Sequence, residues 1–128
     1  MTQPITTKTV AGAHVHRWAD LPRDEPMPLL SRRRVIGERV MISEIRLEAG
    51  CSVPTHTHEN EQMALVVSGK MRFGIGAEDA PERRTVELGA GEVLHLPPNV
   101  PHSADAVESS VVIDVFSPIA EKTGIDRD

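Results

Sequence analysis

Short apolar segments, broken at intervals by glycine and proline, are the feature of this sequence that most restricts its fold. Apolar and polar side chains alternate in residues 39–48, RVMISEIRLE, and in residues 70–76, KMRFGIG. Residues 110–116, SVVIDVF, are rich in β-branched side chains. A period of two predicts strands, and several short strands between turn residues predict a β-sandwich or a small barrel. We therefore expect an all-β fold whose interior can hold one small ligand.

The length and the distribution of these segments predict one domain. The chain has 128 residues, which is an ordinary size for a single domain. The alternating segments lie in residues 39–118, which we expect to form the barrel core. Residues 1–38 have no such pattern and are expected to be irregular, and the three prolines in LPRDEPMPLL predict an extended segment that covers the core as part of the same domain. The polar C-terminal segment, residues 119–128, is expected to form a short helix or to fray.

Composition argues against several classes of partner. The net charge of −5 offers no basic stripe for nucleic acid, and we interpret at least two of the arginines at 32–34 as part of a solvated turn before a strand. No apolar stretch approaches the roughly 18–20 residues of a membrane span, and the N-terminus lacks the pattern of a signal peptide. The single cysteine, Cys51, fits a reducing compartment. We expect a cytoplasmic protein without a nucleic-acid or membrane partner.

Two short motifs contain the residue types of a metal site. In residues 54–69, PTHTHENEQMALVVSG, His56 and His58 are two positions apart, so on a strand they would share a face. Gln62 follows where the next strand begins, and His102 comes directly after the stiff turn PPNVP. Three imidazoles with one amide oxygen suit Zn, Ni, Fe or Mn. Such a set leaves positions open for water or substrate, which is typical of a catalytic metal.

The two motifs together resemble those of the cupin superfamily. Residues 50–69 are similar to the first cupin motif, which has a glycine, H-x-H, an acid three or four residues later and a second glycine. Residues 91–102, GEVLHLPPNVPH, resemble the second motif, with its glycine, proline, turn and histidine. The resemblance implies a single-domain double-stranded β-helix of the jelly-roll type. His95 lies within the second motif, and we expect it in the core or the pocket rather than as a further ligand.

The resemblance also implies which residues bind one divalent transition-metal ion. Carried over by position, the ligands are His56, His58, His102 and the residue at position 62. Most family members have a glutamate at that position, whereas this chain has Gln62. Glu61 is adjacent, and a shifted register would offer its carboxylate instead. The two side chains should point to opposite faces of a strand, and the spacing to the following glycine favours Gln62.

A narrower resemblance comes from the segment HENEQ and the later segment DVFSP. Both are similar to the KdgF-like cupins that linearise unsaturated uronates, in which glutamine is the third ligand and an Asp and a Phe lie on the last strand. This implies an acid–base role for Asp114 and a place in the substrate pocket for Phe116. Where that branch usually has a basic residue after FSP, this chain has IAEKTG. In this chain Arg34, which we place in the substrate pocket with Phe116, or else Arg46, Arg72 or Lys122, would have to bind the uronate carboxylate instead.

Two functions of different classes fit these residues. The first is an enzyme in which the metal acts as a Lewis acid on a small sugar acid or keto acid and Asp114 moves a proton. An Fe(II)-dependent dioxygenase would use the same ligands. The second is a sensory cupin whose metal positions a ligand without turnover. An acid beside the metal favours the enzyme. Exposed edge strands further predict a homodimer, because pairing covers them.

Overall fold

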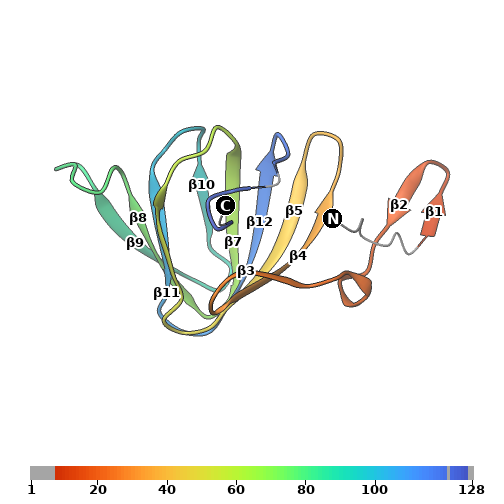
Figure 1. The fold of residues 1–128 in the computed structure, drawn as a ribbon, viewed down its shortest axis with the longest axis horizontal. Coiled ribbons are helices and arrows are strands. Elements are labelled where there is room, and N and C mark those ends of the chain that lie inside the picture. Colours follow the sequence, from red (N-terminus) through yellow and green to blue (C-terminus); the bar gives the residue numbers. More distant parts are fainter. Residues whose placement is uncertain (1–7, 121, 127–128) are drawn as a thin grey trace.

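The computed structural model describes residues 8–120 and 122–126, and it consists almost entirely of strands. Its helical structure within those residues is one short turn, η1 (Trp18–Asp20). None of the helical structure in the described part of the chain is long and apolar enough to cross a membrane. The predicted all-β, jelly-roll-like class is confirmed, although hydrogen bonds do not close the sheets into one continuous barrel (Figure 1).

The larger sheet has six strands in the order β10-β7-β12-β5-β4-β3, and all neighbouring strands are antiparallel. Its strands are β3 (Asp24–Met27), β4 (Leu30–Ile36), β5 (Met41–Leu47), β7 (Glu61–Ser68), β10 (Val93–Leu96) and β12 (Ser110–Ser117). The β-branched strand β12 lies between β7 and β5, and alternate residues along it are buried. The period of two in its sequence therefore separates an inner face from an outer face.

The smaller sheet has four antiparallel strands in the order β6-β11-β8-β9. Its strands are β6 (Ser52–His56), β8 (Lys70–Ile75), β9 (Arg84–Gly89) and β11 (His102–Ala106). Figure 1 shows β8, β9 and β11 on one side of the molecule, β12, β5 and β4 on the other, and the C-terminal end between them. The two inner faces thus enclose a common interior.

Aliphatic and sulfur-containing side chains fill this interior, as the scarcity of aromatic residues requires. The largest fully buried side chains are Met41, Met71, Leu96, Val66 and Cys51. Alternation in the sequence predicts this face correctly in β5, where Met41, Ile45 and Leu47 are buried, and in β8, where Met71 and Phe73 are buried. Each such side chain contributes roughly 1.5–3 kcal/mol of hydrophobic stabilisation.

The N-terminal part of the chain is more regular than the sequence suggests. Residues 1–7 lie outside the described residues, but β1 (Lys8–Val10) and β2 (Ala13–Val15) form a hairpin, and β3 and β4 extend the six-stranded sheet. In Figure 1 the hairpin projects away from the two sheets. The expectation of an irregular segment is therefore wrong, while the division of the chain at residue 38 stays a prediction.

Apolar alternation does not reveal strand β4 in the sequence, because arginines occupy part of its inner face. Leu30, Arg32 and Arg34 alternate with Ser31 and Arg33 along the strand, and Arg32 is only 3% exposed. The interpretation of these arginines as a solvated turn is wrong. A buried guanidinium is stable in such a place only when carboxylates pair with it, and the sequence alone does not show them.

Gly69 makes the sharp connection through which the chain passes from β7 in one sheet to β8 in the other. Its φ of +89° lies in the left-handed region that side chains disfavour. A Cβ there would also lie 2.2 Å from Ser110 Oγ and 2.4 Å from the backbone oxygen of Ser109. The turn therefore requires glycine for two separate reasons.

We expect Gly69→Ala to destabilise the fold much more than Gly50→Ala. Gly50 has a similar φ of +92°, but a Cβ there would meet nothing within 4 Å. Left-handed strain of about 1–2 kcal/mol should therefore account for the whole cost at Gly50. Gly69→Ala should lose about 3 kcal/mol or more, because the backbone must also move. Urea denaturation of both variants measures the difference, and equal losses would contradict it.

Candidate metal centre

The tertiary structure brings three histidines from two motifs together at one end of the interior. His56 is the last residue of β6, His58 lies just beyond it, and His102 begins β11. His102 pairs directly with His56 across the two strands. The ligand atoms of the three side chains all lie within 4.8 Å of one another. Their ring centroids are 4.3–5.6 Å apart, so one ion can be reached by all three.

Backbone carbonyls set the orientation of each imidazole. The Nδ1 atoms lie 2.8, 3.0 and 2.9 Å from the carbonyl oxygens of Pro54 (for His56), Asn60 (for His58) and Val100 (for His102). A carbonyl oxygen only accepts hydrogen bonds, so each Nδ1 carries the proton and each neutral ring leaves Nε2 with a free lone pair. This is the usual way in which a protein prepares histidines as metal ligands.

The surroundings also favour the neutral form of His56 and of His102. The pKa of His102 is lowered to about 4: burial is the largest cause, the neighbouring His56 and His58 also lower the pKa, and the hydrogen bond to Val100 opposes them. Burial likewise lowers the pKa of His56. A histidine must be unprotonated to bind a metal, so these low pKa values favour the ligand form at neutral pH.

Gln62 connects the histidines to a buried acid. It lies on the inner face of β7, where its Oε1 is 3.1 Å from His58 Nε2 and its Nε2 donates a hydrogen bond of 3.0 Å to Asp114 Oδ1. With the amide so oriented, Oε1 and His58 Nε2 are both acceptors, and no proton lies between them. A cation bound by both atoms would remove this repulsion. The donor set therefore fits a metal ion, although Gln62 as its ligand stays a prediction.

Glu61 and His95 lie on the opposite face of the sheet. Glu61 Oε2 is 2.6 Å from His95 Nε2, and both side chains are half exposed. The sequence predicted a core or pocket position for His95, and that prediction is wrong because β10 pairs with β7 so that His95 stands beside the outward Met63. Of the two candidates at this position, only Gln62 faces the histidines.

Asp114 is a carboxylic acid enclosed by apolar walls. It pairs with Ala64 on β7 and Ser43 on β5, and it lines a cavity together with Val112 and Phe116. Burial raises the pKa of Asp114 to about 7, and the hydrogen bond from Gln62 opposes the shift. Phe116 packs edge-on against His58, with ring centroids 5.8 Å apart. The cavity therefore joins the histidines to an acid that exchanges protons near neutral pH.

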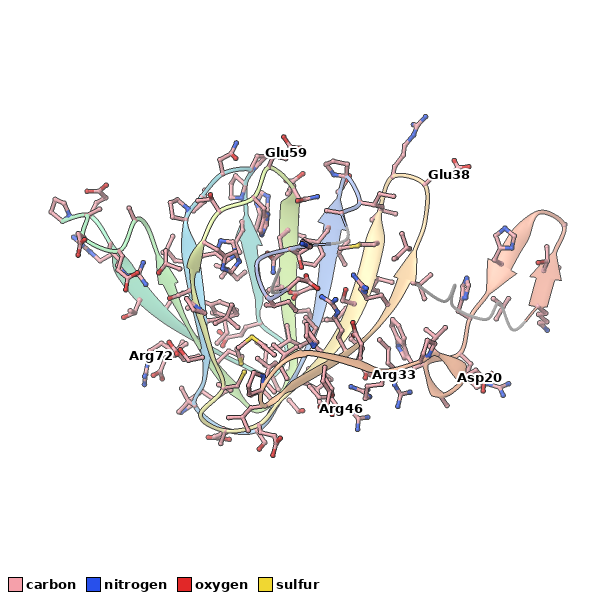
Figure 2. The ribbon with its side chains drawn as sticks, in the orientation of Figure 1. Asp20, Arg33, Glu38, Arg46, Glu59 and Arg72 are labelled. Carbon is pink, nitrogen blue, oxygen red and sulfur yellow. The ribbon has the colours of Figure 1, made fainter. Side chains whose placement is uncertain are left out.

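The four cationic side chains that could bind a substrate carboxylate differ in their exposure. Arg46 and Arg72 have side chains that are 58% and 47% exposed and point away from the interior (Figure 2), and Lys122 is exposed. Arg34 lies on the inner face of β4 with a side chain that is 10% exposed, 4.0 Å from Asp24. The sequence patterns did not identify Arg32 as a buried residue. Arg32 is two positions from both Leu30 and Arg34, so it shares their strand face, and this spacing was the available signal.

Comparison with known proteins agrees with this geometry. Residues 43–116, more than half of the chain, match a family model described as a cupin domain. This chain belongs to the cupin family. Among curated proteins, none matches its sequence significantly.

Solved cupin structures share the fold. An RmlC-like cupin from Shewanella frigidimarina NCIMB 400 is 21% identical, with a TM-score of 0.74, over 94% of this chain and 97% of that one. KdgF from Halomonas sp. is 25% identical, with a TM-score of 0.69, over 80% of this chain and 93% of that one. Oxalate decarboxylase from Bacillus subtilis, a protein with Mn(II) centres, is 22% identical with a TM-score of 0.72 over 83% of this chain, which spans 30% of its length.

We expect His102→Ala to lose the metal and His95→Ala to retain it. Removing one of the three converging imidazoles should weaken binding by more than the roughly 10- to 100-fold typical of losing a residue that only orients a ligand. His95 is the matched control because it is on the outer face. Elemental analysis and titration with Zn²⁺, Ni²⁺ and Mn²⁺ measure the effect.

In the same assay Gln62→Ala should weaken metal binding and Glu61→Ala should not. The reverse result would assign the fourth ligand to Glu61.

Proposed function

We propose that this cupin is a metal-dependent enzyme that acts on a small sugar acid or keto acid. In this proposal His56, His58, Gln62 and His102 hold one divalent transition-metal ion, and Asp114 transfers a proton. The observation that carries the proposal is the contact from the histidines through Gln62 to Asp114, a buried acid whose pKa is about 7. A cupin that only binds its ligand has no need of such an acid beside the metal site.

The residues of the pocket suit proton transfer to or from a bound substrate. When bound, the metal would supply Lewis acidity that polarises a carbonyl or hydroxyl oxygen of the substrate. Asp114 would take a proton from, or return one to, the adjacent carbon or oxygen, which its pKa near neutrality allows. The amide of Gln62 holds the Asp114 carboxyl in place, and the apolar walls Val112 and Phe116 exclude water. Enol-to-keto conversion, ring opening and isomerisation all consist of such transfers.

Uronate linearisation is the form of this chemistry that we favour. Its support is the likeness to KdgF from Halomonas sp., over nearly the full length of that protein, together with a glutamine at position 62 and the pair Asp114 and Phe116. For the metal we keep Ni, Zn, Fe and Mn, the ions that a set of imidazoles and one amide oxygen suits. The Mn(II) centres of oxalate decarboxylase add weight to Mn.

We expect Asp114→Asn to retain the metal and the fold but to lose turnover by roughly 10²–10⁴-fold, because asparagine preserves the shape and cannot exchange the proton. The assay follows the absorbance of unsaturated uronates with metal-loaded protein, and then a panel of small keto acids. Asp114→Asn that turns over as fast as wild type would remove the acid–base mechanism. A fully metal-loaded wild-type protein that turns over nothing in the panel would favour the sensory cupin.

We further propose that the protein forms a homodimer. The outer face of the six-stranded sheet carries Met63, Val67 and Val93, which are 40%, 47% and 56% exposed, and a second copy would cover them. We expect Val93→Glu to shift the protein to monomer, whereas Val107→Glu, in the turn between β11 and β12, should not. Sedimentation equilibrium measures the mass, and a monomeric wild type at tens of micromolar would contradict the proposal.

A further inference from the structure

The C-terminal segment of residues 123–126, which we name the tail, lies over the cavity. The side chains of Thr123 and Ile125 line the cavity, and Thr123 is only 5% exposed. A Cβ at Gly124 would lie 2.2 Å from His56 Nε2, so the Gly124 backbone packs directly on the edge of the ring that carries the free lone pair. In Figure 1 the blue segment that follows β12 turns back and lies between the two sheets. The tail therefore covers the histidines in this conformation.

An ion pair with Arg32 anchors the tail. The Asp126 carboxylate accepts a hydrogen bond of 3.1 Å from Arg32 Nη1 and a second, shorter one from Nη2. Asp24 occupies the other edge of the same guanidinium, with 3.0 Å from Nε to Oδ1 and 3.1 Å from Nη2 to Oδ2. The amide of Thr123 donates to Asp126 and fixes the turn of the tail. Asp126 is thus held as one half of a bidentate carboxylate–guanidinium pair.

This ion pair lies on the inner face that also carries Asp114. Arg32 pairs with Ile45 on β5, which lines the cavity, and Arg34 pairs with Ser43 on β5, which in turn pairs with Asp114 on β12. Two strand spacings separate β4 from β12, or about 10 Å.

Opening the tail would leave one edge of a buried guanidinium without an acceptor. With the tail in place the Arg32 side chain is 4% exposed, and Asp126 supplies the acceptors at this edge. Asp24 is 51% exposed at the outer edge and would keep its own contacts. Unsatisfied buried donors are costly, and a carboxylate of a ligand has the geometry to satisfy both at once. The same opening would uncover His56.

We propose that the edge of Arg32 occupied by Asp126 is the carboxylate subsite of this pocket, and that Asp126 is an intramolecular competitor which a carboxylate ligand displaces. The acidic nature of the ligand rests on the proposed function, but binding at this subsite does not require turnover. The tail exchanges one carboxylate for another on the same guanidinium, and the Gly124 backbone leaves His56 as it does so. Arg32 is then the residue that selects an acidic ligand.

The test is calorimetric titration of the metal-loaded full-length protein with D-galacturonate, and with D-galactose as the uncharged probe. Asp126→Asn should bind galacturonate roughly 5- to 150-fold more tightly than wild type, the range of typical coupling energies, because the competitor is weakened. Galactose, which offers Arg32 no carboxylate, should bind more weakly than galacturonate to both proteins. Asp24→Asn is the matched control. It removes one negative charge beside the same guanidinium but leaves Asp126 in place, so it should change galacturonate affinity much less.

A second variant opens the tail without altering Arg32 or its partners. Gly124→Ala places a methyl group against His56 and should also tighten galacturonate binding. Unchanged galacturonate affinity in both Asp126→Asn and Gly124→Ala would overturn the proposal. An equal gain in Asp126→Asn and Asp24→Asn would also overturn it, since the cause would then be general charge.

The outcome separates the subsite from the proposed enzyme activity. Tighter galacturonate binding in Asp126→Asn, without turnover of any uronate or keto acid, would support the subsite and refute the enzyme. Turnover that proceeds while galacturonate affinity stays the same in Asp126→Asn and Gly124→Ala would refute the subsite and leave the enzyme standing.

Discussion

The placement of β12 between β5 and β7 is the constraint on which the rest of this structure depends. This strand is distant in sequence from both partners, yet its register sets Asp114 beside Ala64 on one side and Ser43 on the other. The same register brings the Gln62 amide within hydrogen-bonding distance of Asp114. A slip of one residue would turn Asp114 out of the interior and put Ile113 or Val115 in its place.

Within that frame the polar groups of the interior depend on one another. The interior is aliphatic, so Gln62, Asp114 and His102 have few partners besides each other and nearby carbonyls. Burying them costs free energy, and the raised pKa of Asp114 and the lowered pKa of His102 express that cost. Perturbed acids and bases gathered in one cavity are typical of a functional site, because a core built for stability alone would be apolar.

Sequence patterns correctly predicted the features that depend on residues close together in the chain. The spacing of His56 and His58 and the turn before His102 depend on strand geometry and turn chemistry, which act over short distances. The pattern therefore indicated a metal site, and the structure brings these three side chains together. The family resemblance followed from the same two motifs, and the family model covers both. The alternation of β5 and β8 likewise identified the buried faces, because a period of two is a local property.

The sequence by itself determined the strand-forming segments, the family and the three converging histidines. Only the tertiary structure decided which polar residues face inward, because that depends on partners far away in the chain. His95 was misplaced because its face follows from the register of β10 on β7. Arg32 was overlooked because the carboxylates that allow its burial come from Asp24 and from Asp126, which is 94 positions away. Burial of a charge is a property of the pair, and a pair of this kind forms only when folding has brought both ends of the chain together.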